Sequence, residues 1–278
     1  MLNISAEEIK VISKYIHDIS GIYLDSSKKY LLETRLNVLA EEYGSSSYMD
    51  FYQKAKADTS KVIERKIIDA ISTNETLFFR DNGPFQLLQH KIIPELIDAR
   101  SKKGSLLKPN IKIWSAASST GQELYSVAIV LRELLGDLSK YSLKLLGTNI
   151  SDAAISQASS GKYNKFEIER GLPKDKLNKY FTPSGQTWKV HDQLRAMVNF
   201  RKFNLMSSFA GLGKFDIILC RNVAIYFTLE DRKKLFNKIA DTLEPDGYLI
   251  IGSTESLTGV CPRFIPKKHL RTIFYQLQ

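Results

Sequence analysis

Residues 111–135 read IKIWSAASSTGQELYSVAIVLRELL, and this stretch decides the fold. Ile111–Ala117 is an apolar run of strand length, and Gln122–Leu135 has the periodicity of a helix. From Ser115 to Gly121 the residues are small and lead into that helix. Small side chains let a ligand approach the backbone, and a helix N-terminus offers free N–H groups. The stretch predicts either a ligand-binding turn or simply a tight strand-to-helix turn.

The same alternation recurs further along the chain. We predict these elements: strand Ser142–Ile150, helix Ser151–Ser160, strand Phe215–Cys220, helix Leu229–Leu243 and strand Tyr248–Ser253. Repeated strand–helix–strand units are typical of a parallel sheet with helices on both faces. The predicted fold class is therefore α/β, with a doubly wound, mostly parallel, Rossmann-like sheet. Closing edge strands are expected within Phe264–Gln278.

The residues before this sheet are predicted to be helical. Ser5 and Glu8 form a capping-box pattern, and isoleucines then recur at steps of three and four. Further helices are expected near residues 25–43, 49–56, 61–71 and 85–102. We divide the chain into an N-terminal helical domain, 1–75, and a larger domain, 76–278. Within the larger domain, the alternating runs TWKV and MVNFRKF predict a small antiparallel β insert at about 181–206.

The composition is that of an ordinary globular protein, with 43% hydrophobic and 25% charged residues in a chain of 278. No apolar run reaches the ~20 residues of a membrane span, and the N-terminus lacks the pattern of a signal peptide. We expect a cytoplasmic protein without membrane insertion. Cys220, Cys261 and four scattered histidines lack metal-ligand spacing, so no metal is expected. A monomer is expected, because no long heptad pattern is present.

The net charge of +10 indicates either an acidic partner or a solvated basic surface. Residues 1–75 hold 10 lysines and arginines against 12 acids, which leaves 30 and 18 for residues 76–278. The excess of positive charge therefore lies in the larger domain.

Three further segments are candidates for a site. Thr148-Asn149-Ile150 ends a predicted strand, where nucleotide-binding folds commonly place an acid that accepts hydrogen bonds from a ribose. The run RNVAIYF, residues 221–227, follows another strand, although taken alone its aromatic residues favour buried packing over a site. TNETLFFR, residues 73–80, joins the two domains and combines polar groups with an arginine that suits a carboxylate, or it is only a linker.

Taken together, these segments resemble the CheR-type chemotaxis receptor methyltransferases over nearly the whole chain. The resemblance rests on several motifs in the correct order: TNETLFFRD, IKIWSAASSTGQELYS, LLGTNIS, FDIILCRNVAIYF and LEPDGYLIIGSTESL. It implies a protein that uses S-adenosylmethionine (SAM) to esterify glutamates on the cytoplasmic helices of methyl-accepting chemoreceptors. It also implies that the β insert in some members docks a peptide from the receptor C-terminus by strand addition.

The resemblance assigns roles to residues that match the family's motifs. It implies these cofactor-binding residues: Asn74, Thr76, Arg80, Glu123, Asn149, Asn204, Leu205, Asn222 and Val223. Arg80 would also face the incoming carboxylate, and Tyr226 would lie beside the transferred methyl group, so these two are the predicted catalytic residues. A glutamate side chain is already anionic at neutral pH, so no general base is required. Lys28, Lys29 and Arg35 would present a basic surface to the acidic receptor helices.

The sequence departs from the family's usual pattern at four positions. These are Ser118, Gln122, Leu124 and Asn149, where the family usually has cysteine, glutamate, proline and aspartate. Asn149 matters most, because a lost charge-assisted hydrogen bond to the ribose costs about 1–3 kcal/mol. An alternative interpretation is therefore a weakly active or non-catalytic SAM- or nucleotide-binding regulatory protein on a chemosensory array. A nucleic-acid methyltransferase is disfavoured, because the loop RNVAIYF does not have the sequence of the loops that hold a flipped base in such enzymes. No nucleic-acid partner is expected.

Overall fold

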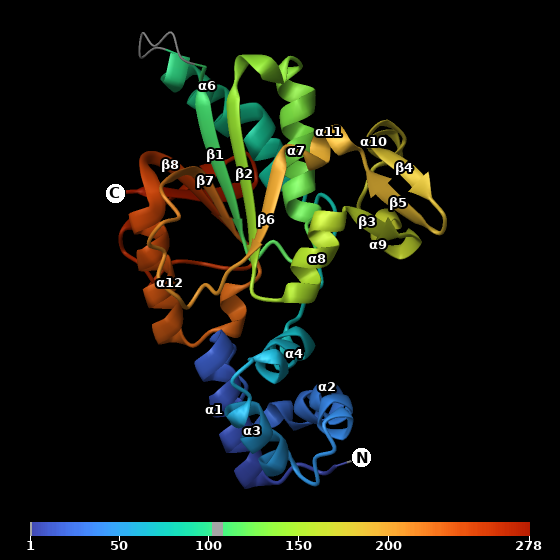
Figure 1. The fold of residues 1–278 in the computed structure, drawn as a ribbon. Helices are drawn as coiled ribbons and strands as arrows, with labels where there is room; N and C mark the ends of the chain where they lie inside the picture. The colour runs from blue at the N-terminus through green and yellow to red at the C-terminus, as the bar shows by residue number, and fades with distance from the viewer. Residues whose placement is uncertain (1, 102–107) are drawn as a thin grey trace.

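A computed structural model describes residues 2–101 and 108–278. Its larger domain is built on a 7-stranded sheet in the order β6-β2-β1-β7-β8-β10-β9 (Figure 1). The strands are β1 (Asn110–Ala116), β2 (Ser142–Asn149), β6 (Val198–Lys202), β7 (Phe215–Cys220), β8 (Leu243–Ile251), β9 (Phe264–His269) and β10 (Thr272–Leu277). The first five in the spatial order run parallel, and β10 is antiparallel to both β8 and β9. The predicted mostly parallel α/β sheet and its closing edge strands are confirmed.

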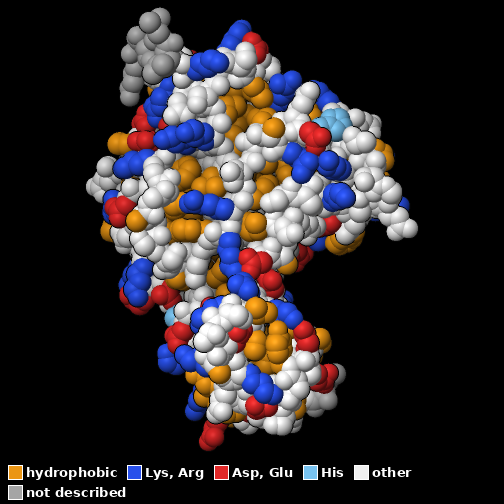
Figure 2. Space-filling view, viewed as in Figure 1, with side chains coloured by type: hydrophobic (Ala, Val, Ile, Leu, Met, Phe, Trp, Pro, Cys, Tyr) orange, Lys and Arg blue, Asp and Glu red, His pale blue; other side chains and the backbone are white. Residues whose placement is uncertain are grey.

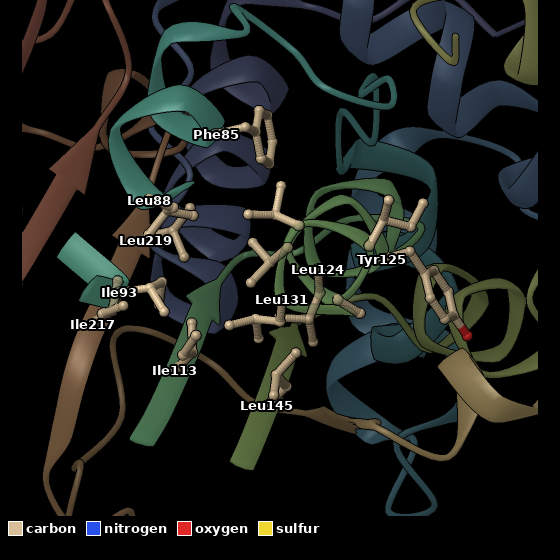
Figure 3. Packing of buried hydrophobic residues seen from close by; sticks show 14 of the residues in the cluster. Phe85, Leu88, Ile93, Ile113, Leu124, Tyr125, Leu131, Leu145, Ile217 and Leu219 are labelled. Atoms are coloured by element: carbon tan, nitrogen blue, oxygen red, sulfur yellow. The ribbon is translucent and has the colours of Figure 1, made fainter. Parts of the chain in front are cut away.

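Both faces of the sheet are buried. Successive side chains of a strand point to opposite faces, and accordingly Ile217 and Ile218 of β7 belong to different hydrophobic clusters. The first cluster packs against α5 (Gly83–Leu87), a π-helical turn (Leu88–Ile92), α6 (Ile93–Ser101) and α7 (Gln122–Leu135), as Figure 3 shows. The second packs against α12 (Leu229–Thr242). The sheet is therefore doubly wound, as predicted.

The helical domain consists of α1 (Ala6–Ser20), α2 (Lys29–Glu42), α3 (Tyr48–Ala57) and α4 (Val62–Ile71) around a core of their own. The capping box of Ser5 and Glu8 is present at the start of α1, and Gly21 ends this helix with a φ of 79°. A Cβ at Gly21 would lie 2.4 Å from Cγ of Met206 in the larger domain. The left-handed backbone conformation favours glycine here, and a side chain would also have to displace that of Met206.

The structure corrects the predicted β insert. The small sheet has the order β3-β5-β4, formed by β3 (Lys162–Asn164), β5 (Thr187–Val190) and β4 (Phe181–Ser184). The run TWKV belongs to it, but the prediction was wrong for MVNFRKF, which forms β6 at the edge of the main sheet, parallel to β2. A strand at the edge of a larger sheet is half-buried and alternates in the same way as a strand of a small sheet, so alternation did not distinguish the two.

The remaining elements connect these layers. They are α8 (Asp152–Ser160), α9 (Lys165–Glu169), α10 (Lys174–Tyr180), α11 (Asp192–Arg195) and the 3-10 turns at Ser26–Lys28, Leu138–Lys140 and Ala224–Tyr226. Residues 244–247 lie within β8, whose register against β7 shifts between Phe215 and Ile217. Lys102, the predicted end of one helix, lies outside the described residues. Within the described ranges, no helix is both long and apolar enough to cross a membrane.

Candidate active site

A cavity of about 460 Å³ lies between the helical domain and the carboxyl ends of β1, β2 and β7. It is lined by segments from both domains that are far apart in the sequence. All the site residues suggested by the sequence lie in this lining: Asn74, Thr76, Arg80, Glu123, Asn149, Asn204, Leu205, Asn222, Val223 and Tyr226. Its volume is in the range of small-molecule sites, and domain interfaces are a preferred location for them.

The small-residue turn after β1 forms one wall of the cavity. Ala117, Ser119 and Gly121 have φ values of 62°, 51° and 97°, so the turn is left-handed at alternate residues although only one of them is glycine. The Ser118 N–H donates to the Thr148 carbonyl (2.7 Å), which ties the turn to β2. Such backbone conformations cluster at ligand sites, where the surrounding structure maintains them. The geometry therefore exceeds what a simple tight turn requires.

Asn149 ends β2 in the cavity wall and is 6% exposed. Its Oδ1 accepts a hydrogen bond from the N–H of Ser151 (2.9 Å), and its Nδ2 donates to Oδ1 of Asn74 (3.4 Å). The side chain therefore presents an amide, already engaged by the protein, at a position where a carboxylate would offer more free acceptor sites.

Arg80 lies in a strained segment at the domain junction. Phe79, Asp81 and Asn82 have φ values of 53°, 62° and 29°. The half-buried guanidinium of Arg80 donates to the Glu75 carbonyl at 3.3 Å and lines the cavity. Most of its donors are thus left for a ligand.

Arg221 is a site residue that sequence reasoning missed. Its side chain is 2% exposed, and Nη1 donates to Oε2 of Glu123 (2.8 Å). Its Nη2 donates to Oδ2 of Asp81 (2.9 Å) and to the carbonyl of Arg80 (2.8 Å). One buried guanidinium therefore fixes both Glu123 and the strained segment. The signal in the sequence was an arginine directly after a fully buried strand, since a charge in such a position requires partners.

The loop after β7 completes the larger domain's contribution to the wall. Asn222 has a φ of 55°, and its N–H donates to Oε2 of Glu255 (2.7 Å).

Asn204, which follows β6, donates from Nδ2 to the Ile19 carbonyl (3.0 Å) and accepts at Oδ1 from the N–H of Met206 (2.8 Å). Asn204 therefore also joins the larger domain to the end of α1.

The helical domain supplies residues that the sequence did not identify as lining a cavity. Tyr23, Asp25 and Lys28 line the cavity, and the N–H of Tyr23 donates to the carbonyl of Tyr226 (2.8 Å). The prediction for Arg35 was wrong: instead of extending from the surface, its Nη1 donates to the Ile71 carbonyl (2.8 Å) at the end of α4. Helical periodicity shows which face is buried but does not identify the neighbour that covers it.

Metal ligation is not indicated in the part of the chain that the structure describes, where no group of three or more His, Cys, Asp or Glu side chains is placed to hold an ion. Cys220 and Cys261 are both buried free thiols.

Comparison with known proteins agrees with this architecture. The family model of the CheR methyltransferase SAM-binding domain matches residues 74–271, and that of the CheR all-alpha domain matches residues 7–72. The chain is 39% identical over 263 residues to the chemotaxis protein methyltransferase Cher2 of Pseudomonas putida, covering 93% of this chain and 92% of that protein. It is 38% identical over 282 residues to a chemotaxis protein methyltransferase of Vibrio parahaemolyticus, covering 100% and 99%. The chain belongs to the CheR methyltransferase family, and its larger domain is the SAM-binding domain of that family.

Proposed function

We propose that this protein transfers the methyl group of SAM to glutamate side chains of chemoreceptors and forms methyl esters. The observation that carries the proposal is the cavity between the domains, which gathers every residue that the family's motifs suggested. Several of these residues are separated by more than a hundred positions in the sequence. The sheet alone does not require these residues to lie around one cavity, so their shared location supports a retained site.

The side chains of the cavity fit SAM chemically. A partly exposed carboxylate, Glu123, suits the ammonium group of the cofactor, and the guanidinium of Arg80 suits the cofactor's carboxylate. Asn149 would meet the ribose, and the apolar side chains of Leu205 and Val223 would cover the adenine ring. The left-handed turn after β1 brings backbone close to the ligand without large side chains. When bound, SAM supplies a methyl group activated by its sulfonium.

The chain's own residues need only orient the acceptor and exclude water. A glutamate side chain has an ordinary pKa of about 4.3, so it is a nucleophilic carboxylate at neutral pH without a general base. Arg80 would hold this carboxylate in line with the methyl group, and Tyr226 would form the adjacent wall. The segment that follows α1 covers the cavity, and the hydrogen bond from the N–H of Tyr23 to the carbonyl of Tyr226 holds it there.

The proposed partners are the helices of chemoreceptors. Lys28 lines the cavity, and Lys28 and Lys29 are both exposed, so they would attract acidic residues that flank a target glutamate. Figure 2 shows lysines and arginines scattered over the visible face among acids and hydrophobic side chains, not one continuous basic surface of the kind that follows a nucleic-acid backbone. We expect the rate of methylation to fall as salt is raised.

Two further parts of the proposal concern assembly. The edges of the small sheet are β3 and β4, and either edge would accept an added strand from a receptor C-terminal peptide. We also propose that the protein acts in the cytoplasm as a monomer.

The proposal is tested by incubating the full-length protein with methyl-labelled SAM and chemoreceptor cytoplasmic fragments. We expect label on the receptor that alkali releases as methanol, as a carboxyl ester requires. Arg80→Ala should lower the rate by about 100-fold. Arg263→Ala is the control, because this arginine pairs with Asp241 outside the cavity and should not affect the rate. Alkali-stable label, or SAM binding without transfer to any receptor, would contradict the proposal.

A further inference from the structure

The small sheet packs directly on the segment that carries Arg80. Phe78 is fully buried, and its ring meets those of Tyr163 on β3 and Phe181 on β4 edge-on, with centroids 5.0 Å and 5.4 Å apart. Gly171, between α9 and α10, has a φ of 93°, and a Cβ there would lie 2.3 Å from the carbonyl oxygen of Phe78. The backbone of residues 75–80 is thus confined by the small sheet and by the chain that leads to it.

The same sheet also contacts the small-residue turn. The hydroxyl of Tyr163 donates to the carbonyl of Thr120 at 2.8 Å, and the Tyr163 side chain is fully buried. Burial raises the pKa of Tyr163, so the hydroxyl keeps its proton and remains a donor. A second hydrogen bond joins the small-residue turn to the segment of residues 73–80, because the hydroxyl of Ser119 donates to the Asn74 carbonyl at 2.7 Å.

We propose that Tyr163 is a positioning residue for the cofactor, through which the small sheet holds the turn at 117–121 in its binding conformation. The proposal deepens the proposed function, because it rests on SAM binding in the cavity between the domains. The small sheet would then have a role in the transfer reaction itself, separate from any role in docking a receptor peptide.

The physical reason lies in the conformation of the turn. Non-glycine residues with positive φ are unfavourable and persist only where contacts outside the turn maintain them. Thr120 is 8% exposed, so without the Tyr163 hydroxyl its carbonyl would be buried with one partner fewer. The turn would relax, and residues 117–119, which line the cavity, would move with it.

Two isosteric variants separate positioning from stability. Tyr163→Phe removes the bond to the Thr120 carbonyl, whereas Tyr125→Phe removes a matched bond, from another buried tyrosine to the Ala158 carbonyl at 2.9 Å. Both should lower the melting temperature by similar amounts. In calorimetric titration with S-adenosylhomocysteine, Tyr163→Phe should weaken binding by about 3- to 10-fold. Tyr125→Phe should leave the affinity within about twofold of wild type.

A second pair tests the sheet's contact with Phe78. Gly171→Ala places a methyl group against the Phe78 carbonyl, and Gly185→Ala imposes similar backbone strain, at a φ of 63°, where nothing lies within 4 Å. We expect Gly171→Ala to weaken S-adenosylhomocysteine binding and Gly185→Ala to leave it unchanged. Equal effects within both pairs would overturn the positioning role.

Hydrogen exchange of the ligand-free proteins keeps this inference distinct from the proposed function. Amides of residues 117–121 should exchange faster in Tyr163→Phe than in wild type, with no such change in Tyr125→Phe. If the wild-type protein bound no S-adenosylhomocysteine, the proposed function would fail. The exchange rates of Tyr163→Phe and Tyr125→Phe would still decide whether Tyr163 orders the turn. Unchanged exchange in Tyr163→Phe would refute the inference even in a protein that methylates receptors.

Discussion

At position 149 the protein places an amide at the end of a central strand, with its oxygen accepting from the Ser151 N–H and its NH₂ group directed to Asn74. A carboxylate there would accept hydrogen bonds from both ribose hydroxyls of the cofactor. If an aspartate replaced Asn149, the Asn74 amide could rotate and donate to its carboxylate, so this substitution need not leave buried groups unpaired. We therefore expect Asn149 to limit cofactor affinity without distorting the site.

The first prediction at the residue scale follows from that limit. Asn149→Asp should tighten S-adenosylhomocysteine binding by about 10- to 100-fold, measured by calorimetry. Asn199→Asp, which makes the same charge change on the exposed edge strand β6, is the control and should have no effect. Weaker binding by Asn149→Asp would show that the pocket is adapted to an amide.

The second prediction concerns Arg221, which holds Glu123 and the Arg80 segment together. Arg221→Lys keeps the charge but cannot form the same fork of hydrogen bonds, so S-adenosylhomocysteine binding should weaken by about 10-fold or more. Arg100→Lys is the matched control, because Arg100 is also largely buried and joins two carboxylates, Asp216 and Asp246.

Both arginine variants should lower the melting temperature by several degrees, since each leaves a buried carboxylate poorly paired. Neither Asp216 nor Asp246 lines the cavity, so Arg100→Lys should bind S-adenosylhomocysteine normally below its melting temperature. Equal binding by the two variants would limit Arg221 to a structural role.

Motifs in the sequence identified residues that line the cavity, whereas residues that only the packed structure brings together left no signal of this kind. Asn74 and Asn222 belong to motifs, and both line the cavity. Arg221 stands beside Asn222, yet its bond to Glu123 spans 98 positions and leaves no local pattern. Tyr23 could not be identified for the same reason, because the sequence does not state which surface the end of α1 meets.

At the scale of elements, α1 and α12 join the two domains beside the cavity. Nε2 of His17 lies 2.8 Å from Oδ2 of Asp231, in the first turn of α12. Hydrogen bonds from Thr228 and then from His17 lower the pKa of Asp231 below its ordinary value. A carboxylate with a lowered pKa stabilises the fold above its unfolded-state pKa, and that contribution is lost as the pH falls through the folded-state pKa.

We therefore expect Asp231→Asn to melt at a lower temperature than wild type near neutral pH. The difference should narrow as the pH falls from about 5 toward 3, because wild-type Asp231 then becomes protonated. Asp241→Asn, an exposed carboxylate on the same helix, is the control and should change the melting temperature little. A difference independent of pH would show that the charge of Asp231 does not contribute.

Elements with strong periodicity were predictable, and elements defined by their partners were not. The helix predicted at Gln122–Leu135 and the strand predicted at Phe215–Cys220 are confirmed with the same bounds. The run MVNFRKF was correctly expected to contain a strand, but its partner is β2 of the main sheet. Pairing is decided by long-range contacts that one strand's sequence does not contain.

At the scale of the whole molecule, the cavity depends on both domains. The larger domain provides the turn and the loops at the ends of its strands, and the helical domain provides residues between Ser20 and Leu31 and between Ile71 and Glu75. The sequence could predict two units of different fold, because helical periodicity changes to alternating strands and helices near their junction. It could not predict that the helical unit covers the site, since that depends on how two folded surfaces meet.

The measurement that tests this account most directly is a calorimetric titration of the intact wild-type protein with S-adenosylhomocysteine, the product of methyl transfer from SAM. We expect binding of one molecule per chain with a dissociation constant in the micromolar range. We also expect competition by SAM, because both occupy the cavity between the domains. The absence of binding would contradict the account and show that the residues gathered in this cavity serve a different ligand.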